Sequence, residues 1–271
     1  MPTRNLKWVS DMNRSFVTLA TCALIALLAL AGCRQPTPYP EFRTLPYPAA
    51  ALLGQHHILG SSARGTPIMA QTFGQGPDVV LIMAAIHGDE PAGTPLVRRL
   101  AQHLNNNLQL LNGRTIILLP VANPDGVARN TRENAAGVDL NRNFETANRI
   151  NTPATGLVPL SEPETRIIKD LIKQYAPDRI VTIHQPLACI DYDGPAAALA
   201  AGMAEYCDLP VKKLGAKPGS LGSYAGLTLA IPIVTLELQQ TDSQLAPESL
   251  WRKYANTLLA AIVYPETPAS K

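Results

Sequence analysis

The 271-residue chain contains few aromatic residues (5%), few charged residues (16%) and only four cysteines. Its formal net charge of +2, with no run of more than two lysines or arginines, argues against a nucleic-acid-binding protein. Only one long apolar segment is present, near the N-terminus, which excludes a polytopic membrane protein. Hydrophobic residues make up 46% of the chain, so a packed core is expected and extensive disorder is not. The length fits one large domain or two small ones.

The apolar N-terminal segment is predicted to be a targeting signal. Three basic residues precede the apolar residues 16–31, and the segment ends in Leu-Ala-Gly followed by Cys33. This ending resembles a bacterial lipobox, in which the cysteine thiol carries a lipid. We therefore expect a lipoprotein signal peptide at residues 1–32, then the lipidated cysteine and a proline-rich tether at 33–54. A plain membrane anchor or an uncleaved signal is the alternative.

A lipoprotein of this kind would be anchored in the bacterial cell envelope and face the periplasm. Arg34 follows the lipidated cysteine instead of the aspartate associated with inner-membrane retention, which favours the outer membrane. In an exported protein Cys189 and Cys207 could form a disulfide, although two free thiols are equally compatible with the sequence. No segment indicates a protein partner.

From residue 55 onward, short apolar runs alternate with segments of helical periodicity. Ser161 and Glu164 have the spacing of a capping box at the start of one helix. The alternation predicts a single α/β domain at residues 55–264 with a mixed, mostly parallel β-sheet flanked by helices on both faces, and a tail at 265–271. Ligands bind such sheets at the carboxyl ends of the strands. The predicted buried strands are 79–86, 115–121, 180–183 and 231–238, a hairpin covers 57–73, and the predicted helices are 91–104, 161–175, 196–206 and 247–263.

Three candidate metal ligands follow predicted strands. His87 and Glu90 come after the first buried strand, and His184 ends another strand 97 residues later. Neutral imidazole and carboxylate groups suit zinc. The His-x-x-Glu pair alone is a weak signal, because most such pairs lie on protein surfaces, and the third residue gives it weight. The other histidines lack this placement and are interpreted as surface or packing residues: His56, His57 and His103.

The segment between these ligands is rich in amides and contains two arginines that are candidates for substrate binding. Residues 123–126 read Asn-Pro-Asp-Gly, and residues 132–144 include Arg132 and Arg142. The forked donors of arginine are suited to hold carbonyl or carboxylate oxygens. One such arginine alone would be interpreted as a solvated loop charge, but the whole segment favours binding.

Together these motifs resemble the zinc carboxypeptidases of the carboxypeptidase A type. The resemblance covers residues 55–264, and two stretches, 184–190 and 218–223, are similar to the murein peptide amidases of that family. The shared motifs occur in the family's order: His87-x-x-Glu90, Asn-Pro-Asp-Gly, Gly-Val-Asp-Leu-Asn-Arg-Asn-Phe ending at Phe144, Ser-Glu-Pro-Glu-Thr ending at Thr165, His184, and Thr-Leu-Glu-Leu ending at Leu238.

The resemblance implies a one-zinc hydrolase. His87, Glu90 and His184 would bind the zinc ion and leave a fourth position for water. Glu237 would act as the general base, taking a proton from that water and returning it to the leaving amine.

The resemblance also implies a set of substrate contacts. Arg132 would polarise the scissile carbonyl and stabilise the oxyanion, and Asn141 with Arg142 would clamp a substrate carboxylate. Ser220 and Asp191 are further candidate substrate contacts. Two other residues are less defined: Asp193 is interpreted as a solvated loop acid, and Tyr224 is a possible counterpart of the carboxypeptidases' mobile-loop tyrosine.

The reaction that the resemblance implies is hydrolysis of the amide bond between γ-D-Glu and meso-diaminopimelate in a murein peptide. A general metallocarboxypeptidase acting on L-peptides is the first alternative. A deacylase of the acylase branch is disfavoured by the intact Asn-Pro-Asp-Gly motif and the strand that carries Glu237. A non-catalytic cell-wall-binding lipoprotein is the last alternative, but such a protein would be expected to lack a zinc ligand or the base.

Overall fold

The computed structural model describes residues 53–265. The predicted signal peptide, the lipidation site Cys33 and all but the last two residues of the predicted tether lie outside this range, as does the tail beyond residue 265. All the described residues belong to one compact unit. Within them, no helix combines the length and apolar character needed to cross a membrane.

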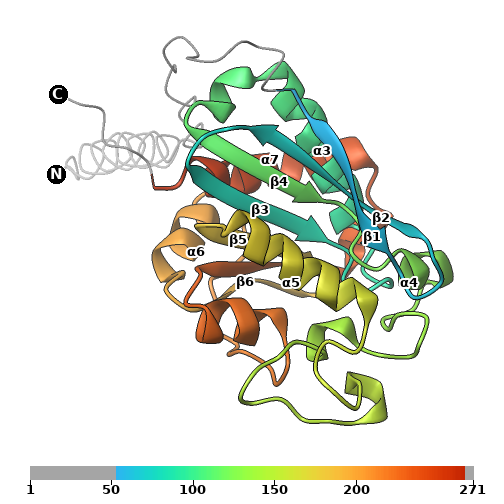
Figure 1. The fold of residues 1–271 in the computed structure, drawn as a ribbon. Coiled ribbons are helices and arrows are strands. Elements are labelled where there is room, and N and C mark those ends of the chain that lie inside the picture. The colour runs from blue at the N-terminus through green and yellow to red at the C-terminus, as the bar shows by residue number, and fades with distance from the viewer. Residues whose placement is uncertain (1–52, 266–271) are drawn as a thin grey trace, which may run out of the picture. The chain divides into compact units, whose positions relative to one another are not determined.

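A seven-stranded mixed sheet forms the centre of the domain, with the strand order β1-β2-β4-β3-β5-β7-β6 (Figure 1). The central strands are parallel to one another: β4 (Arg114–Leu119), β3 (Asp78–Ala84), β5 (Arg179–His184) and β7 (Ile233–Gln239). Antiparallel strands complete both edges: β1 (Gln55–Ser61) and β2 (Pro67–Gly74) on one side, and β6 (Leu187–Asp193) on the other.

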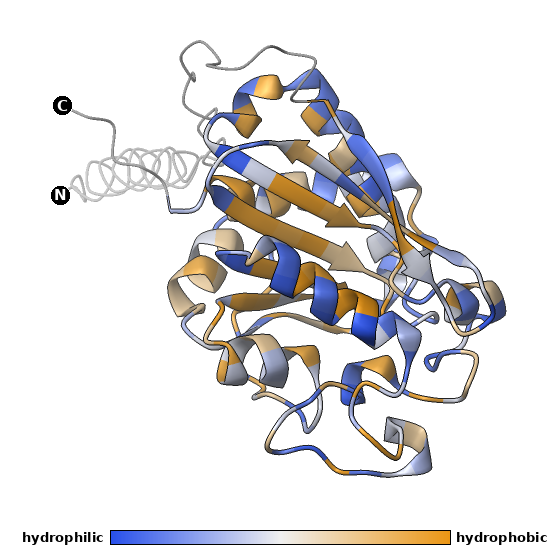
Figure 2. Ribbon diagram, in the orientation of Figure 1, coloured by the Kyte–Doolittle hydropathy of each residue, from blue (hydrophilic) through white to orange (hydrophobic). Residues whose placement is uncertain are grey.

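The central strands are apolar because helices cover both faces of the sheet. Every residue of β5 is buried, and the central strands are mainly hydrophobic in Figure 2. The helices α3 (Gly93–Asn106) and α7 (Pro247–Val263) pack together on one face, with α6 (Ala197–Ala204) against α7. The helix α5 (Pro163–Tyr175) covers the other face and turns its hydrophilic side outward. The predicted α/β fold class is confirmed.

One strand was missed, and one local prediction was wrong. The strand β6 was not predicted, because its segment contains Asp191 and Asp193 and gains its partners only by pairing with β7. The predicted capping box was wrong: α5 begins after Glu162 without a side-chain cap. The carboxylate of Glu164 instead accepts hydrogen bonds from the backbone N–H of Ala63 (3.0 Å) and from the side chain of Asn134 (3.1 Å). Tertiary partners therefore replaced the local cap.

The two cysteines of the described domain do not form a disulfide. Cys189 is buried in β6, and Cys207 is partly buried beyond the end of α6. Both are free thiols.

Candidate active site

A tight turn after β3 positions the first two candidate metal ligands. The backbone enters the left-handed region at Ala85 (φ 51°), and the N–H of Glu90 then donates a hydrogen bond to the carbonyl oxygen of His87 (3.4 Å). Gly88 lies directly against the backbone of Gly126, and a Cβ atom at position 88 would be 2.0 Å from the carbonyl carbon of that residue. Only glycine fits at this contact. The turn leaves the side chains of His87 and Glu90 both buried.

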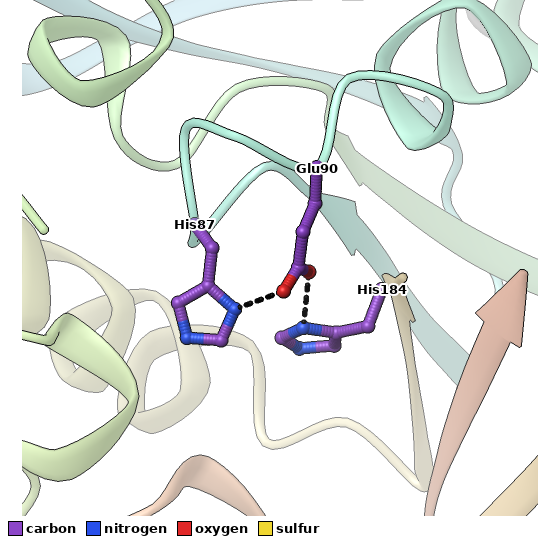
Figure 3. A group of neighbouring side chains, drawn as sticks. All are labelled: His87, Glu90 and His184. Carbon is purple, nitrogen blue, oxygen red and sulfur yellow. Dashed lines mark hydrogen bonds and ion pairs between the residues drawn. The ribbon is translucent and has the colours of Figure 1, made fainter. Parts of the chain in front are cut away.

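The three candidate ligands meet at one carboxylate group (Figure 3). Nδ1 of His87 lies 2.7 Å from Oε1 of Glu90, and Nδ1 of His184 lies 2.7 Å from Oε2 of the same side chain. One donor atom from each residue lies within 4.8 Å of the others, and all three residues are buried. Burial alone would raise the pKa of Glu90, but the adjacent histidines hold that pKa well below its usual range. Two imidazole nitrogens and one ionised carboxylate form a donor set suited to zinc.

Glu237 lies beside this cluster on the neighbouring strand. His184 at the end of β5 pairs with Glu237 of β7, so the two side chains lie on the same face of the sheet. The backbone N–H of Leu187 donates a long hydrogen bond to Oε2 of Glu237 (3.4 Å). Burial and the nearby charge of Glu90 raise the pKa of Glu237. A carboxylate with a raised pKa is a stronger proton acceptor, which is the property that a general base requires.

Asp139 is a functional candidate that the sequence analysis missed. Its Oδ1 lies 3.2 Å from Nε2 of His87, the ring nitrogen facing away from Glu90, and its Oδ2 accepts a hydrogen bond from Nε of Arg132 (3.0 Å). The hydrogen bond with His87 and the nearby arginine charges lower the pKa of Asp139, although burial opposes the shift. Asp139 therefore fixes the ring of His87, whose Nδ1 is a candidate metal ligand, and the side chain of Arg132. In the sequence, only its place in the motif that ends at Phe144 pointed to a role for Asp139.

We expect Asp139→Asn to weaken zinc binding by about 10- to 100-fold, because partners of ligating histidines orient the ring and increase its basicity. The measurement is zinc affinity by competition with a chelator of known affinity. Asp208→Asn, at an exposed position beyond α6, is the matched control and should bind zinc like the wild type. An unchanged zinc affinity in the Asp139 variant would show that its contact with His87 does not support the metal site.

The candidate substrate contacts line the same cavity as the metal cluster and Glu237. Nη1 of Arg132 approaches Oε1 of Glu90 (3.4 Å), and its side chain remains 37% exposed. Nη1 of Arg142 donates to the backbone carbonyl of Asn141 (2.6 Å), and the side-chain oxygen of Asn141 accepts from the N–H of Leu221 (2.8 Å). The structure therefore brings all the predicted contacts into one cavity: Arg132, Asn141, Arg142, Asp191 and Ser220.

Asp191 and Ser220 are both buried, and the side chain of each accepts a hydrogen bond from a backbone N–H. Asp191 is buried in β6, and its Oδ1 accepts a hydrogen bond from the N–H of Leu214 (2.8 Å). Ser220 is buried, and its hydroxyl oxygen accepts from the N–H of Ser223 (3.0 Å). The interpretation of Asp193 as a solvated loop acid was wrong: this residue ends β6, is 6% exposed and lines the cavity.

Tyr224 does not occupy the position expected of a tyrosine near the scissile bond. It lies in the π-helical segment η4 (Gly222–Thr228), is 7% exposed and packs within the hydrophobic core. Its ring stacks on Phe144 with 5.6 Å between the ring centroids. It is not among the residues that line the cavity. The structure therefore assigns Tyr224 a packing role.

Comparison with known proteins gives the family of this chain. The family model for zinc carboxypeptidases (peptidase M14) matches residues 53–193. Murein peptide amidase A of Escherichia coli (strain K12) is 36% identical over 196 residues, covering 66% of this chain and 78% of the relative. The corresponding protein of Vibrio campbellii is 29% identical over 209 residues, covering 70% of this chain and 80% of the relative.

Solved structures agree with this relationship. The murein-tripeptide amidase of Escherichia coli O157 superposes with a TM-score of 0.62 at 27% identity, covering 84% of this chain and 100% of that one. Thrombin-activatable fibrinolysis inhibitor shares the fold, with a TM-score of 0.69 at 17% identity over 79% of this chain and 68% of that one. The predicted zinc dependence is confirmed by the family, and the donor set described above fits the metal. The chain belongs to the zinc carboxypeptidase family and is a zinc-dependent hydrolase.

Proposed function

We propose that this enzyme is a murein peptide amidase that hydrolyses the bond between γ-D-Glu and meso-diaminopimelate. The observation that carries the proposal is a single cavity lined by the His87–Glu90–His184 cluster, the buried carboxylate of Glu237 and two arginines. The similarity to murein peptide amidases over most of the domain supports the choice of substrate. Peptidoglycan peptides would also meet a lipoprotein that faces the periplasm.

The chain's own residues divide the hydrolysis between them. Nδ1 of His87, Nδ1 of His184 and the Glu90 carboxylate would hold the zinc ion, which supplies Lewis acidity and lowers the pKa of water to about 7. The carboxylate of Glu237 accepts a proton from the attacking water and then delivers it to the leaving amine. Its burial limits competing solvation and strengthens it as a base.

The arginines act on oxygen atoms of the substrate. The guanidinium of Arg132, held by Asp139, stabilises the negative charge that develops on the scissile carbonyl oxygen. Arg142 with Asn141 binds a carboxylate of the diaminopimelyl residue. Burial, together with the charge of Arg132, lowers the pKa of Arg142, but the nearby negative charge of Asp139 opposes this change.

The test is release of diaminopimelate from L-Ala-γ-D-Glu-meso-diaminopimelate by the zinc-loaded protein, followed by mass spectrometry. L-peptides ending in hydrophobic or basic residues are assayed in parallel. We expect cleavage of the murein tripeptide and little cleavage of the L-peptides. The opposite pattern would make the enzyme a general metallocarboxypeptidase and would reject the proposal.

We also propose that the enzyme is anchored through a lipid on Cys33 to the membrane of the bacterial envelope, with its domain in the periplasm. The sequence at residues 30–33 supports this anchor. We expect Cys33→Ser to abolish metabolic labelling of the protein with a fatty acid. Cys207→Ser, which changes a thiol outside this motif, should be labelled like the wild type. Equal labelling of the Cys33 variant and the wild type would exclude the proposed anchor.

A further inference from the structure

Asp193 is a buried carboxylate in the active-site cavity, and it has no partner among the residues that the structure describes. It is 6% exposed and lines the cavity that contains the metal cluster. Within residues 53–265 its carboxylate makes no hydrogen bond or ion pair. It lies close to Gly222 of η4, where an added Cβ would be 2.2 Å from its Oδ2. Burying a carboxylate without a partner costs free energy, so its position indicates a cationic ligand.

The position of Asp193 relative to the catalytic groups follows from the sheet register. In the pairing of β6 with β7, Cys189 lies opposite Glu237 and Asp193 lies four residues further along β6. Residues at this spacing share one face of the sheet, about 13 Å apart along the strand. Asp191 lies between them on the same face and is held by the N–H of Leu214. Asp191 and Asp193 therefore lie progressively farther from the reacting bond along β6, as the binding of a long substrate side chain requires.

The charges around Asp193 have both signs. Burial and the adjacent Asp191 raise the pKa of Asp193 to about 6, so it is mostly ionised at neutral pH, and two lysines limit this rise. One of them, Lys213, lies over the ring of Tyr192, with Nζ 5.3 Å from the ring centroid. The other, Lys217, is exposed and lines the same cavity as Asp193. This part of the cavity thus offers an acceptor for an ammonium group and a cation for a carboxylate.

We propose that Asp193 and Lys217 form a subsite for the zwitterionic far end of the diaminopimelyl side chain. Asp193 accepts hydrogen bonds from the distal ammonium group, and Lys217 pairs with the distal carboxylate. The assignment rests on the proposed function and adds to it a basis for selecting diaminopimelate over residues with one distal charge or none.

The test uses four tripeptides of the form L-Ala-γ-D-Glu-X. X is meso-diaminopimelate (both distal charges), L-lysine (ammonium only), L-2-aminopimelate (carboxylate only) or L-norleucine (neither). We expect Asp193→Asn to lower kcat/KM by about 10- to 100-fold for the first two peptides and to leave the other two nearly unchanged. Lys217→Met should instead affect the first and third peptides. The exposed Asp208→Asn and Lys173→Met are matched controls and should change none.

Stability separates recognition from a structural role. The pKa of Asp193 in the folded protein lies above its unfolded value, so this group makes the protein less stable as the pH rises through that range. Asp193→Asn should therefore raise Tm at pH 8 while lowering activity on ammonium-bearing peptides. An equal loss on all four peptides together with a lower Tm would assign Asp193 a structural role and overturn the subsite. Unchanged activity on all four would also overturn it.

A separate binding measurement distinguishes failure of the subsite from failure of the proposed function. If the wild-type enzyme cleaves none of the tripeptides, the proposed function fails. Calorimetric titration of the zinc-loaded protein with free meso-diaminopimelate then tests the subsite. Binding weakened about 10- to 100-fold by Asp193→Asn supports it. Equal binding by the variant and the wild type, or no binding by either, rejects it.

Discussion

Replacing Glu237 with glutamine is expected to lower kcat on the murein tripeptide by at least about 100-fold, while zinc content stays at one ion per chain. The side chain is 9% exposed and lies opposite His184 across two paired strands. Glutamine has nearly the same size and can still accept the hydrogen bond from the N–H of Leu187. It cannot accept a proton from water at neutral pH, so the substitution removes the base and leaves the shape of the cavity.

The measurements are steady-state kinetics and metal analysis on the same preparations. Glu205→Gln changes an exposed carboxylate at the end of α6 and is the matched control, with kcat expected at the wild-type level. Substrate binding should persist in the Glu237 variant, so the loss should fall on kcat more than on KM. Wild-type turnover in this variant would reject the proposed proton transfer.

Much of the fold could be predicted because its centre follows local rules. The parallel strands are continuous apolar runs, and the helices α3 and α5 have amphipathic sequences that set their approximate limits. The carboxyl ends of β3 and β5 then bring His87, Glu90 and His184 together from positions 97 residues apart. No sequence pattern of comparable strength indicated β6. This strand forms because a segment with two acidic residues pairs with the buried strand β7, which is a tertiary contact.

The missing parts of the site depend on contacts that no local pattern reveals. Asp139 acts on a histidine 52 residues away, so its spacing along the chain carries no signal. Asp193 was interpreted as solvated because acids near a turn usually are, whereas pairing with β7 and packing against Gly222 bury it. Tyr224 stacks on Phe144 because its segment folds back onto the core. The roles of the substrate-contact residues therefore stay predictions, although their place in one cavity is now defined.

His184→Ala is expected to remove the zinc ion as well as the activity, in contrast to Glu237→Gln. The substitution deletes one of the three proposed ligands and leaves Oε2 of Glu90 without its imidazole partner. Zinc per chain should fall from about one to near zero in protein purified with zinc present. His56→Ala is the control, because this histidine is exposed and bonded only to Gln71 in the described structure, so its zinc content should not change.

Thermal unfolding shows whether His184→Ala acts through the metal or through the fold. A ligand that binds only the folded state at about 100 times its Kd adds about 2.7 kcal/mol, or a Tm increase of about 5 to 10 °C for a domain of this size. Zinc should therefore raise the Tm of the metal-free wild type and of Glu237→Gln by this amount, but leave His184→Ala unchanged. Each protein is compared with its own metal-free form. The increase in Tm on adding zinc therefore does not include any loss of stability from the cavity that the missing ring leaves. Full zinc content and a wild-type increase in Tm in His184→Ala would show that His87 and Glu90 hold the ion without His184. The three-residue cluster would then not be the zinc site proposed here.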